Sequence, residues 1–159
     1  MGEEVEMVEK IITPEDFVAH GIKISSDFSS YTGENCFALT LTDGSGVAII
    51  KMAGAGAWQH AHHHSITREE YFVFTGVLVL ATLNGRGKMV LRVHHSGQSF
   101  VCKPGMVHAV YRAAGTVFGV AKFIIGENEE EDNDLILEPE PSLEKEISGQ
   151  GDLWTRRYG

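Results

Sequence analysis

Between residues 36 and 125 the chain is a succession of short apolar or alternating runs, rich in β-branched and aromatic residues and separated by glycines. Runs of this length and composition are typical of β-strands. In order they read CFALTLT, GVAIIKM, the histidine segment at 58–64, EEYFVFT, VLVLATL, GKMVLRV, QSFVC, VHAVYR and TVFGVAKFI. About nine short strands at this spacing predict an all-β domain, a sandwich or a barrel.

Two glycine-rich turns indicate how some of these strands pair. DGSG at 43–46 and NGRG at 84–87 each join two runs. Both carry the residues that tolerate a positive φ, which tight hairpins require. We therefore expect the strands on either side of each turn to be antiparallel neighbours.

The length of 159 residues suits one domain with flanking segments. We expect an N-terminal arm at 1–34, the barrel at 35–125 and an acidic C-terminal segment at 126–159. In the arm, Thr13 is a candidate N-cap for a short helix that begins at Pro14. In the C-terminal segment, the prolines of GENEEEDNDLILEPEP argue against a helix, and the final LWTRRYG is aromatic enough to dock elsewhere, a neighbouring subunit included.

The charge of the chain is concentrated near its C-terminal end. Ten acidic residues lie between Glu127 and Glu146 against Lys145 alone, which accounts for the whole net charge of −9. The remainder is formally neutral, so we expect neither nucleic acid nor a membrane as a main partner. The first residues contain no apolar run of signal-peptide length, and we expect a cytoplasmic protein with Cys36 and Cys102 as free thiols.

A histidine-rich segment and the strand after it carry the residues with the most distinctive chemistry. Side chains alternate along a strand, so His62 and His64 share one face and His63 lies on the other. A short loop then reverses the chain, and Glu69 opens the next strand. His108 follows a turn and begins another apolar strand, where it can supply a fourth ligand.

The spacing of these residues resembles the first motif of the cupin superfamily. That motif runs glycine, five residues, histidine, one residue, histidine, three or four residues, glutamate, six residues, glycine. Gly56, His62, His64, Glu69 and Gly76 satisfy every interval, and no other register of the histidines does.

The second cupin motif is matched in part. It runs glycine, five residues, proline, one residue, glycine, two residues, histidine, three residues, asparagine. Gly97, Gly105 and His108 match it, whereas Lys103 and Arg112 replace the proline and the asparagine. Neither replaced position is a metal ligand in the family, so the resemblance, which covers about residues 35 to 125, still implies an intact site.

The resemblance implies a double-stranded β-helix, a jelly-roll barrel, with one divalent transition metal held by His62, His64, Glu69 and His108. A mixed set of nitrogen and oxygen ligands suits Fe, Mn, Ni, Cu, Co or Zn alike, so the metal's identity stays open. The alternative is a barrel that has lost its metal. We expect His63 to lie at the surface.

Three other residues are candidates for substrate binding. Trp58 and His60 share the predicted face of His62, although a core tryptophan and a histidine at the pocket rim are the simpler interpretations. Arg112 lies four residues after His108, which places it on the same face if the strand is regular, where it could hold an acid or a phosphate. A strand-end arginine in solvent is the alternative. No catalytic residue is assigned.

Three functions are compatible with such a site. The first is a dioxygenase, since the site resembles those of the quercetin and acireductone dioxygenases. The second is a sugar or sugar-phosphate isomerase, and the third is a non-enzymatic module that binds a small molecule. A sugar phosphate calls for several cations, and the sequence places only Arg112 inside, with Lys103 at the rim, which favours the dioxygenase. Cupins commonly pair through sheet edges, so we expect a homodimer.

Overall fold

The computed structural model describes residues 11–30, 33–126, 135–137 and 142–148. Within these ranges it contains two short helices, α1 (Pro14–Ala19) and α2 (Ser142–Ser148), and the rest of its regular structure is strands. The strands are β1 (Lys23–Ser29), β2 (Glu34–Thr40), β3 (Gly46–Met52), β4 (Ala57–Trp58), β5 (His62–His64), β6 (Thr67–Thr75), β7 (Val77–Leu83), β8 (Met89–His95), β9 (Ser99–Cys102), β10 (His108–Arg112), β11 (Val117–Ile124) and β12 (Leu135–Leu137).

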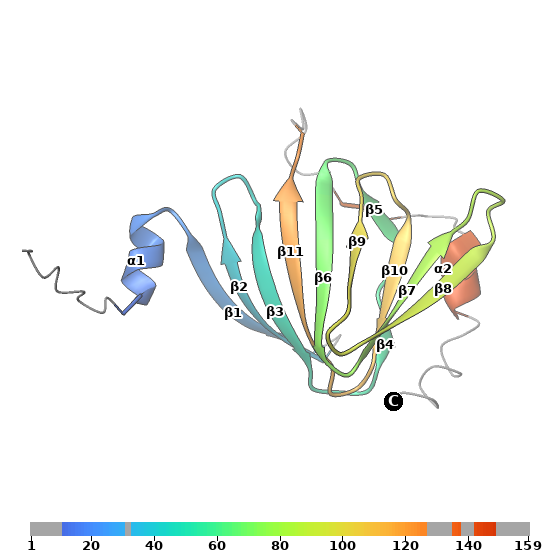
Figure 1. Cartoon of the computed structure of the whole chain (residues 1–159), viewed down its shortest axis with the longest axis horizontal. Coiled ribbons are helices and arrows are strands. Elements are labelled where there is room, and N and C mark those ends of the chain that lie inside the picture. Colours follow the sequence, from blue (N-terminus) through green and yellow to red (C-terminus); the bar gives the residue numbers. More distant parts are fainter. Residues whose placement is uncertain (1–10, 31–32, 127–134, 138–141, 149–159) are drawn as a thin grey trace, which may run out of the picture.

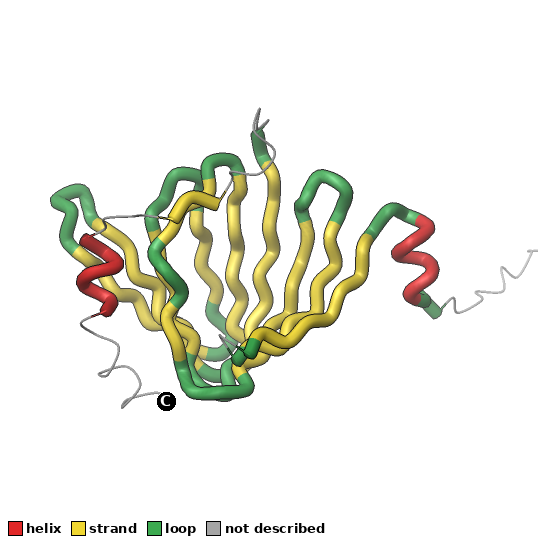
Figure 2. The backbone as a smooth tube through the Cα atoms, turned by 180° about the vertical axis from the view of Figure 1, so that it is seen from behind, coloured by secondary structure: helices red, strands yellow, loops and turns green. Residues whose placement is uncertain are grey.

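The strands form two antiparallel sheets that face each other (Figures 1 and 2). The first sheet has the order β1-β2-β3-β11-β6-β9, and the second has the order β12-β5-β10-β7-β8, with β4 paired to β10. Both predicted hairpins are present, because β2 pairs with β3 and β7 pairs with β8. The two described helices lie outside residues 35–125, so the prediction of an antiparallel barrel is confirmed.

The core lies between the two sheets and follows from the alternation of side chains. On β6, Tyr71 and Val73 are buried while Phe72 and Phe74 are exposed on the outer face. Burying a large apolar side chain contributes about 1.5 to 3 kcal/mol, so the inner apolar stripes of strands such as β6 stabilise the closed form. The main core cluster consists of Met52, Tyr71, Val73, Leu78, Leu80, Phe100, Cys102, Val110, Phe118 and Val120.

The N-terminal arm contributes one helix and one strand. The predicted helix α1 is present, and Thr13 and Asp16 form a capping box at its start. Beyond it, β1 pairs with β2 along its whole length and forms the edge of the first sheet. The sequence analysis does not predict β1, whose run KISSDFS is largely polar.

Two elements after β11 lie against the second sheet. β12 pairs with β5, where the sequence shows only an apolar island at 135–137. α2 packs Leu143 and Ile147 against a cluster that includes Ala61, Ala81 and Ala109. The segment LWTRRYG lies outside the described residues. Neither described helix is long and apolar enough to cross a membrane.

Candidate metal centre

The second sheet places two of the predicted ligands directly opposite each other. β5 carries His62 and His64, and β10 begins with His108, which pairs with His62. His62 and His64 are buried and His63 is half-buried, so the predicted alternation holds over these three residues. His63 is therefore only partly exposed, whereas the sequence analysis expects it at the surface.

A tight turn sets the start of β10. Met106 N–H donates to the Lys103 carbonyl at 3.0 Å, and Gly105 has a φ of 74°, a value that favours glycine. Gly105 N–H donates in turn to the His64 carbonyl at 2.7 Å. The turn is thus tied to β5, which fixes the direction in which His108 enters the barrel.

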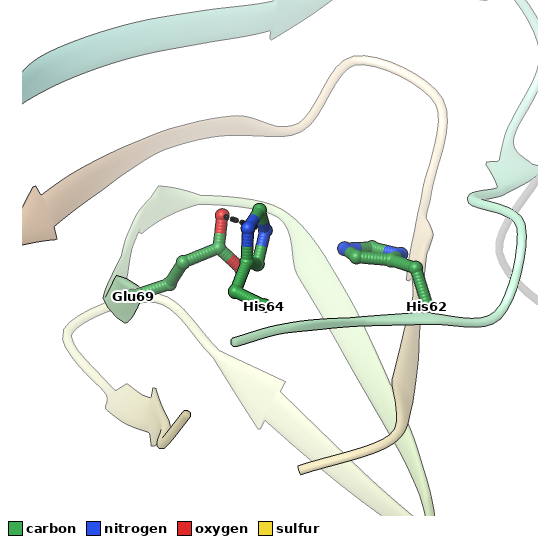
Figure 3. Close-up of side chains that lie close together, drawn as sticks. All are labelled: His62, His64 and Glu69. Atoms are coloured by element: carbon green, nitrogen blue, oxygen red, sulfur yellow. Dashed lines mark ion pairs between the residues drawn. The ribbon is translucent and has the colours of Figure 1, made fainter. Parts of the chain in front are cut away.

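The four predicted ligands come together inside the barrel. Candidate ligand atoms of His62, His64 and Glu69 lie within 4.8 Å of one another, and Figure 3 shows these side chains converging. His108 Nε2 lies 3.2 Å from Glu69 Oε2, and the centroids of the His62 and His108 rings are 4.4 Å apart. The cluster is almost closed to solvent, since Glu69 is 2% and His108 1% exposed.

Backbone carbonyls determine how two of the histidines present their nitrogens. Nδ1 of His62 lies 2.8 Å from the His60 carbonyl, and Nδ1 of His108 lies 2.8 Å from the Met106 carbonyl. A carbonyl can only accept, so Nδ1 of each ring carries a proton, and Nε2 of a ring in its neutral form has a free lone pair. Burial lowers the pKa of His62 to about 4, which keeps that ring neutral at physiological pH. Neutral imidazoles oriented in this way are the form that binds metals.

Glu69 is the centre of the cluster and takes part in contacts through both of its oxygens. Oε1 lies 3.4 Å from His64 Nε2 and 3.2 Å from Lys122 Nζ, and Oε2 lies 3.2 Å from both His108 Nε2 and the Tyr71 hydroxyl. Burial by itself raises the pKa of Glu69, but its hydrogen bonds with His108 and His64 and the charge of Lys122 hold that pKa well below its ordinary value. The carboxylate is therefore ionised and available as an oxygen ligand.

The contact between His108 and Glu69 indicates that the cluster requires a positive charge. With the proton of His108 on Nδ1, Nε2 and the carboxylate oxygen present lone pairs to each other at 3.2 Å. Two acceptors at this distance need a positive charge between or beside them, either a second proton on the ring or a cation. Three imidazoles and one carboxylate fit a divalent transition metal in that role.

His60 does not lie with the buried histidines. The chain leaves strand geometry between β4 and β5, so the alternation expected from Trp58 to His64 is interrupted. The His60 side chain is 66% exposed, and its Nδ1 lies 3.1 Å from Glu144 Oε1. The expectation that His60 shares the inner face is therefore wrong, and its role in substrate binding stays a prediction.

Arg112 is buried, as its spacing from His108 predicts, and it has a partner. Its guanidinium forms an ion pair with Glu34 of β2, and the residue is 2% exposed. Burial lowers the pKa of Arg112, while the charge of Glu34 opposes that shift. Trp58 is half-buried and packs on the Tyr111 ring at a centroid distance of 5.4 Å. Trp58 pairs with Tyr111, three residues after His108 on β10, and His62 pairs with His108, so Trp58 lies on the other face of the sheet and the expectation that it shares the face of His62 is wrong. Substrate binding by Arg112 and Trp58 stays a prediction.

Two contacts of Glu69 are absent from the sequence analysis. Neither Tyr71 nor Lys122 is singled out there. The sequence does contain a signal for Lys122, because this residue continues the alternating inward positions of β11 after Phe118 and Val120. A lysine at a core position of an apolar strand is a candidate for function.

No protein-family description and no curated protein matches the sequence. The fold does match solved structures. The CENP-C cupin domain of Drosophila melanogaster is 12% identical with a TM-score of 0.56, over 72% of this chain and 85% of that chain. An oxalate oxidase is 19% identical with a TM-score of 0.51, over 84% of this chain and 76% of that chain. The Bacillus subtilis oxalate decarboxylase is 12% identical with a TM-score of 0.56, over 85% of this chain and 36% of that chain.

These likenesses show that the chain has the cupin fold, as the sequence motifs predict. The class is thus a cupin-fold barrel with a cluster of histidines and a carboxylate in its interior. The identities are too low to carry an activity from one chain to the other, and the chain spans about a third of the Bacillus subtilis decarboxylase, 36% of its length.

Proposed function

We propose that this protein binds one divalent transition metal through His62, His64, Glu69 and His108 and uses it to act on a small oxygenated substrate, by dioxygenase-like chemistry. The observation that carries the proposal is the convergence of three imidazoles on the Glu69 carboxylate inside the barrel, with His108 Nε2 at 3.2 Å from Glu69 Oε2. A divalent cation satisfies both groups and two further imidazoles at once.

The metal, when bound, would supply either redox chemistry with dioxygen or polarisation of a carbonyl group, according to which ion it is. The residues of the chain prepare its site. The backbone carbonyls of residues 60 and 106 orient His62 and His108, and the Tyr71 hydroxyl donates to Glu69. Burial raises the pKa of Tyr71, so that hydroxyl keeps its proton. The Bacillus subtilis oxalate decarboxylase has Mn(II) centres, which makes Mn(II) one ion to test first.

The cations near the site support the dioxygenase over the sugar-phosphate isomerase. A phosphate dianion is usually held by several positive groups. Arg112 is already engaged by Glu34, which leaves Lys122 as the ammonium that contacts the cluster. A small acid needs fewer cations than a sugar phosphate does.

The test is a comparison of reactions on protein stripped of metal and reloaded with Fe(II), Mn(II), Ni(II), Cu(II), Co(II) or Zn(II) in turn. The substrates are oxalate, a flavonol and fructose 6-phosphate, and the readouts are oxygen consumption and isomer formation. We expect a redox-active ion to support oxygen consumption with one of the first two. Isomerisation of fructose 6-phosphate without oxygen consumption would favour the isomerase, and binding without turnover would favour the non-enzymatic module.

We also propose a homodimer, formed through the outer face of the first sheet. Seven large apolar side chains of this face are 40 to 57% exposed: Phe28, Phe37, Val47, Ile49, Phe72, Phe74 and Phe123. A fully exposed aromatic side chain presents roughly 200 Å², so together they expose about 600 Å², near the roughly 800 Å² that one partner contributes to a standard interface. Neither described helix packs on this face (Figure 1).

A further inference from the structure

Lys122 lies on the inner face of the barrel beside the candidate metal centre. β11 pairs with β6 so that Lys122 is directly opposite Glu69, and paired residues of neighbouring strands point to the same side of a sheet. The preceding residues on that side, Phe118 and Val120, belong to the core. Lys122 is therefore placed by the strand register and continues the inward stripe of β11.

The Lys122 ammonium connects the buried cluster with solvent. Nζ lies 3.2 Å from Glu69 Oε1, whose side chain is 3% exposed, while the lysine side chain is 47% exposed. Lys122 thus contacts Glu69 through its ammonium, while about half of its side chain is open to solvent. An ammonium has three donors, so a contact with Glu69 leaves capacity for a second acceptor.

A small cavity lies next to this lysine. It has a volume of about 190 Å³, and its lining includes Lys122, Val120, Ala38, Thr40 and Ala48. A water molecule takes about 30 Å³ in the liquid, so the space corresponds to about six waters. The lining is mostly small and apolar, with Lys122 as its charged member. The cavity suits a ligand of a few carbon atoms that carries an acidic group.

The balance of charge determines the sign of that group. A divalent cation beside Glu69 would take over the negative charge that Lys122 now neutralises, leaving the ammonium and the metal as neighbouring positive charges. An anion between two cations is strongly favoured at a partly desolvated site. Arg112 offers no such charge, because Glu34 neutralises it.

We propose that Lys122 is a substrate-anchoring residue and that the substrate is a small carboxylic acid, whose anionic group pairs with the Lys122 ammonium where it stands between the cavity and Glu69. The inference rests on the proposed metal centre and adds to it the class of substrate. The single ammonium and the small cavity favour a carboxylate over a phosphate ester.

The experiment measures binding of pyruvate to Co(II)-loaded protein by calorimetry, with the neutral pyruvamide as the matched ligand. Lys122→Met removes the charge and keeps the length of the side chain, and Lys122→Arg keeps the charge. We expect Lys122→Met to weaken pyruvate binding by about tenfold or more and to leave pyruvamide binding unchanged. Lys122→Arg retains most of the affinity. Cobalt content stays at one ion per chain in both variants, because neither removes a ligand.

The two proposals fail in different ways. If wild-type protein takes up no cobalt, the proposal of a metal centre is wrong, and so is the proposed role of Lys122, which depends on it. If cobalt binds but pyruvate does not bind, or binds equally well to Lys122→Met, the anchor alone is wrong. Inorganic phosphate that binds more tightly than pyruvate, with the same dependence on Lys122, would overturn the assignment to carboxylates.

Discussion

His62 shows how burial and hydrogen bonding prepare a single side chain for a metal. Its ring is 7% exposed, its Nδ1 proton is held by the His60 carbonyl, and its other nitrogen faces Glu69, His64 and His108. A histidine in a barrel core without such partners would be an isolated polar group. Here the neutral ring is both the form that the core tolerates and the form that a metal requires.

Burial of His62 predicts acid sensitivity of the metal-free protein. Its pKa is about 4 in the folded state against an ordinary value of 6.5, so between these values the unfolded chain takes up a proton that the folded chain does not. Stability therefore falls as the pH is lowered from 6.5 to 4, by at most about 1.4 kcal/mol per pH unit for this one group. Chemical denaturation of chelator-treated protein at a series of pH values measures the slope. His62→Gln should flatten it, and a slope unchanged in His62→Gln but lost in His63→Gln would show that the wrong histidine is buried.

The convergence of the four candidate ligands is predictable from the sequence, whereas the residues around them are only partly so. The spacing of His62, His64 and Glu69 reflects two adjacent strands and the loop between them, so local sequence contains most of the geometry. The contact of Lys122 with Glu69 depends on the register between β11 and β6, which join residues far apart in the chain. Nothing in the immediate neighbourhood of either residue specifies that register.

At the scale of elements, α2 supports the candidate centre from outside the barrel. Glu144 accepts from the Ala61 backbone N–H at 2.7 Å and lies 3.1 Å from His60 Nδ1. These two residues directly precede His62, whose own Nδ1 donates to the His60 carbonyl. The helix therefore holds the segment that orients one of the predicted ligands.

We expect Glu144→Ala to weaken metal binding by about tenfold, the lower end of what is usual when a group that supports a ligand is removed. The loss of a partner for the buried Ala61 N–H should also cost about 1 to 3 kcal/mol of stability. Competition with a chromophoric chelator measures the affinity. Glu146→Ala, at an exposed position of the same helix, is the control. Equal metal affinities of the Glu144→Ala and wild-type proteins would show that α2 does not support the candidate metal centre.

The elements that escape prediction have weak local patterns. The inner positions of β1 are polar, so it lacks an apolar stripe and is recognised only by its backbone pairing with β2. α2 begins directly after the segment whose two prolines argue against a helix, and the sequence analysis does not predict it, although Leu143 and Ile147 at a spacing of four residues are a signal for it. Strands such as β6 are predictable because one face is apolar and the other more exposed, and β7 is predictable as a short run that is apolar on both faces.

At the scale of the whole molecule, the two faces of the first sheet have different roles. The inner face holds Glu69, Lys122 and the core, and the outer face carries seven exposed apolar side chains together with the Arg68–Glu70 ion pair. The sequence analysis expects pairing through sheet edges, whereas the described structure offers this broad face. An apolar surface of about this size on a monomer is usually an interaction site.

The proposed dimer predicts that charge on this face separates the subunits. Light scattering at micromolar concentration should give the mass of a dimer for wild-type protein and that of a monomer for Phe37→Glu and Phe72→Glu. Val18→Glu, at an exposed position of α1 away from the sheet, should remain dimeric. A monomeric mass for the wild-type protein would contradict the proposal, and so would a dimer that both substitutions leave intact.

The most direct test of the central claim is the metal content of the purified protein and its alanine variants, measured by elemental analysis after loading with a single divalent ion. We expect about one ion per chain in the wild type and in His63→Ala, and a sharp loss in His62→Ala, His64→Ala, Glu69→Ala and His108→Ala. His63 is the matched control, because it lies on the same strand and is turned to the other side. Retention of a full complement of metal by these four variants, or an equal loss from His63→Ala, would contradict the proposed metal centre.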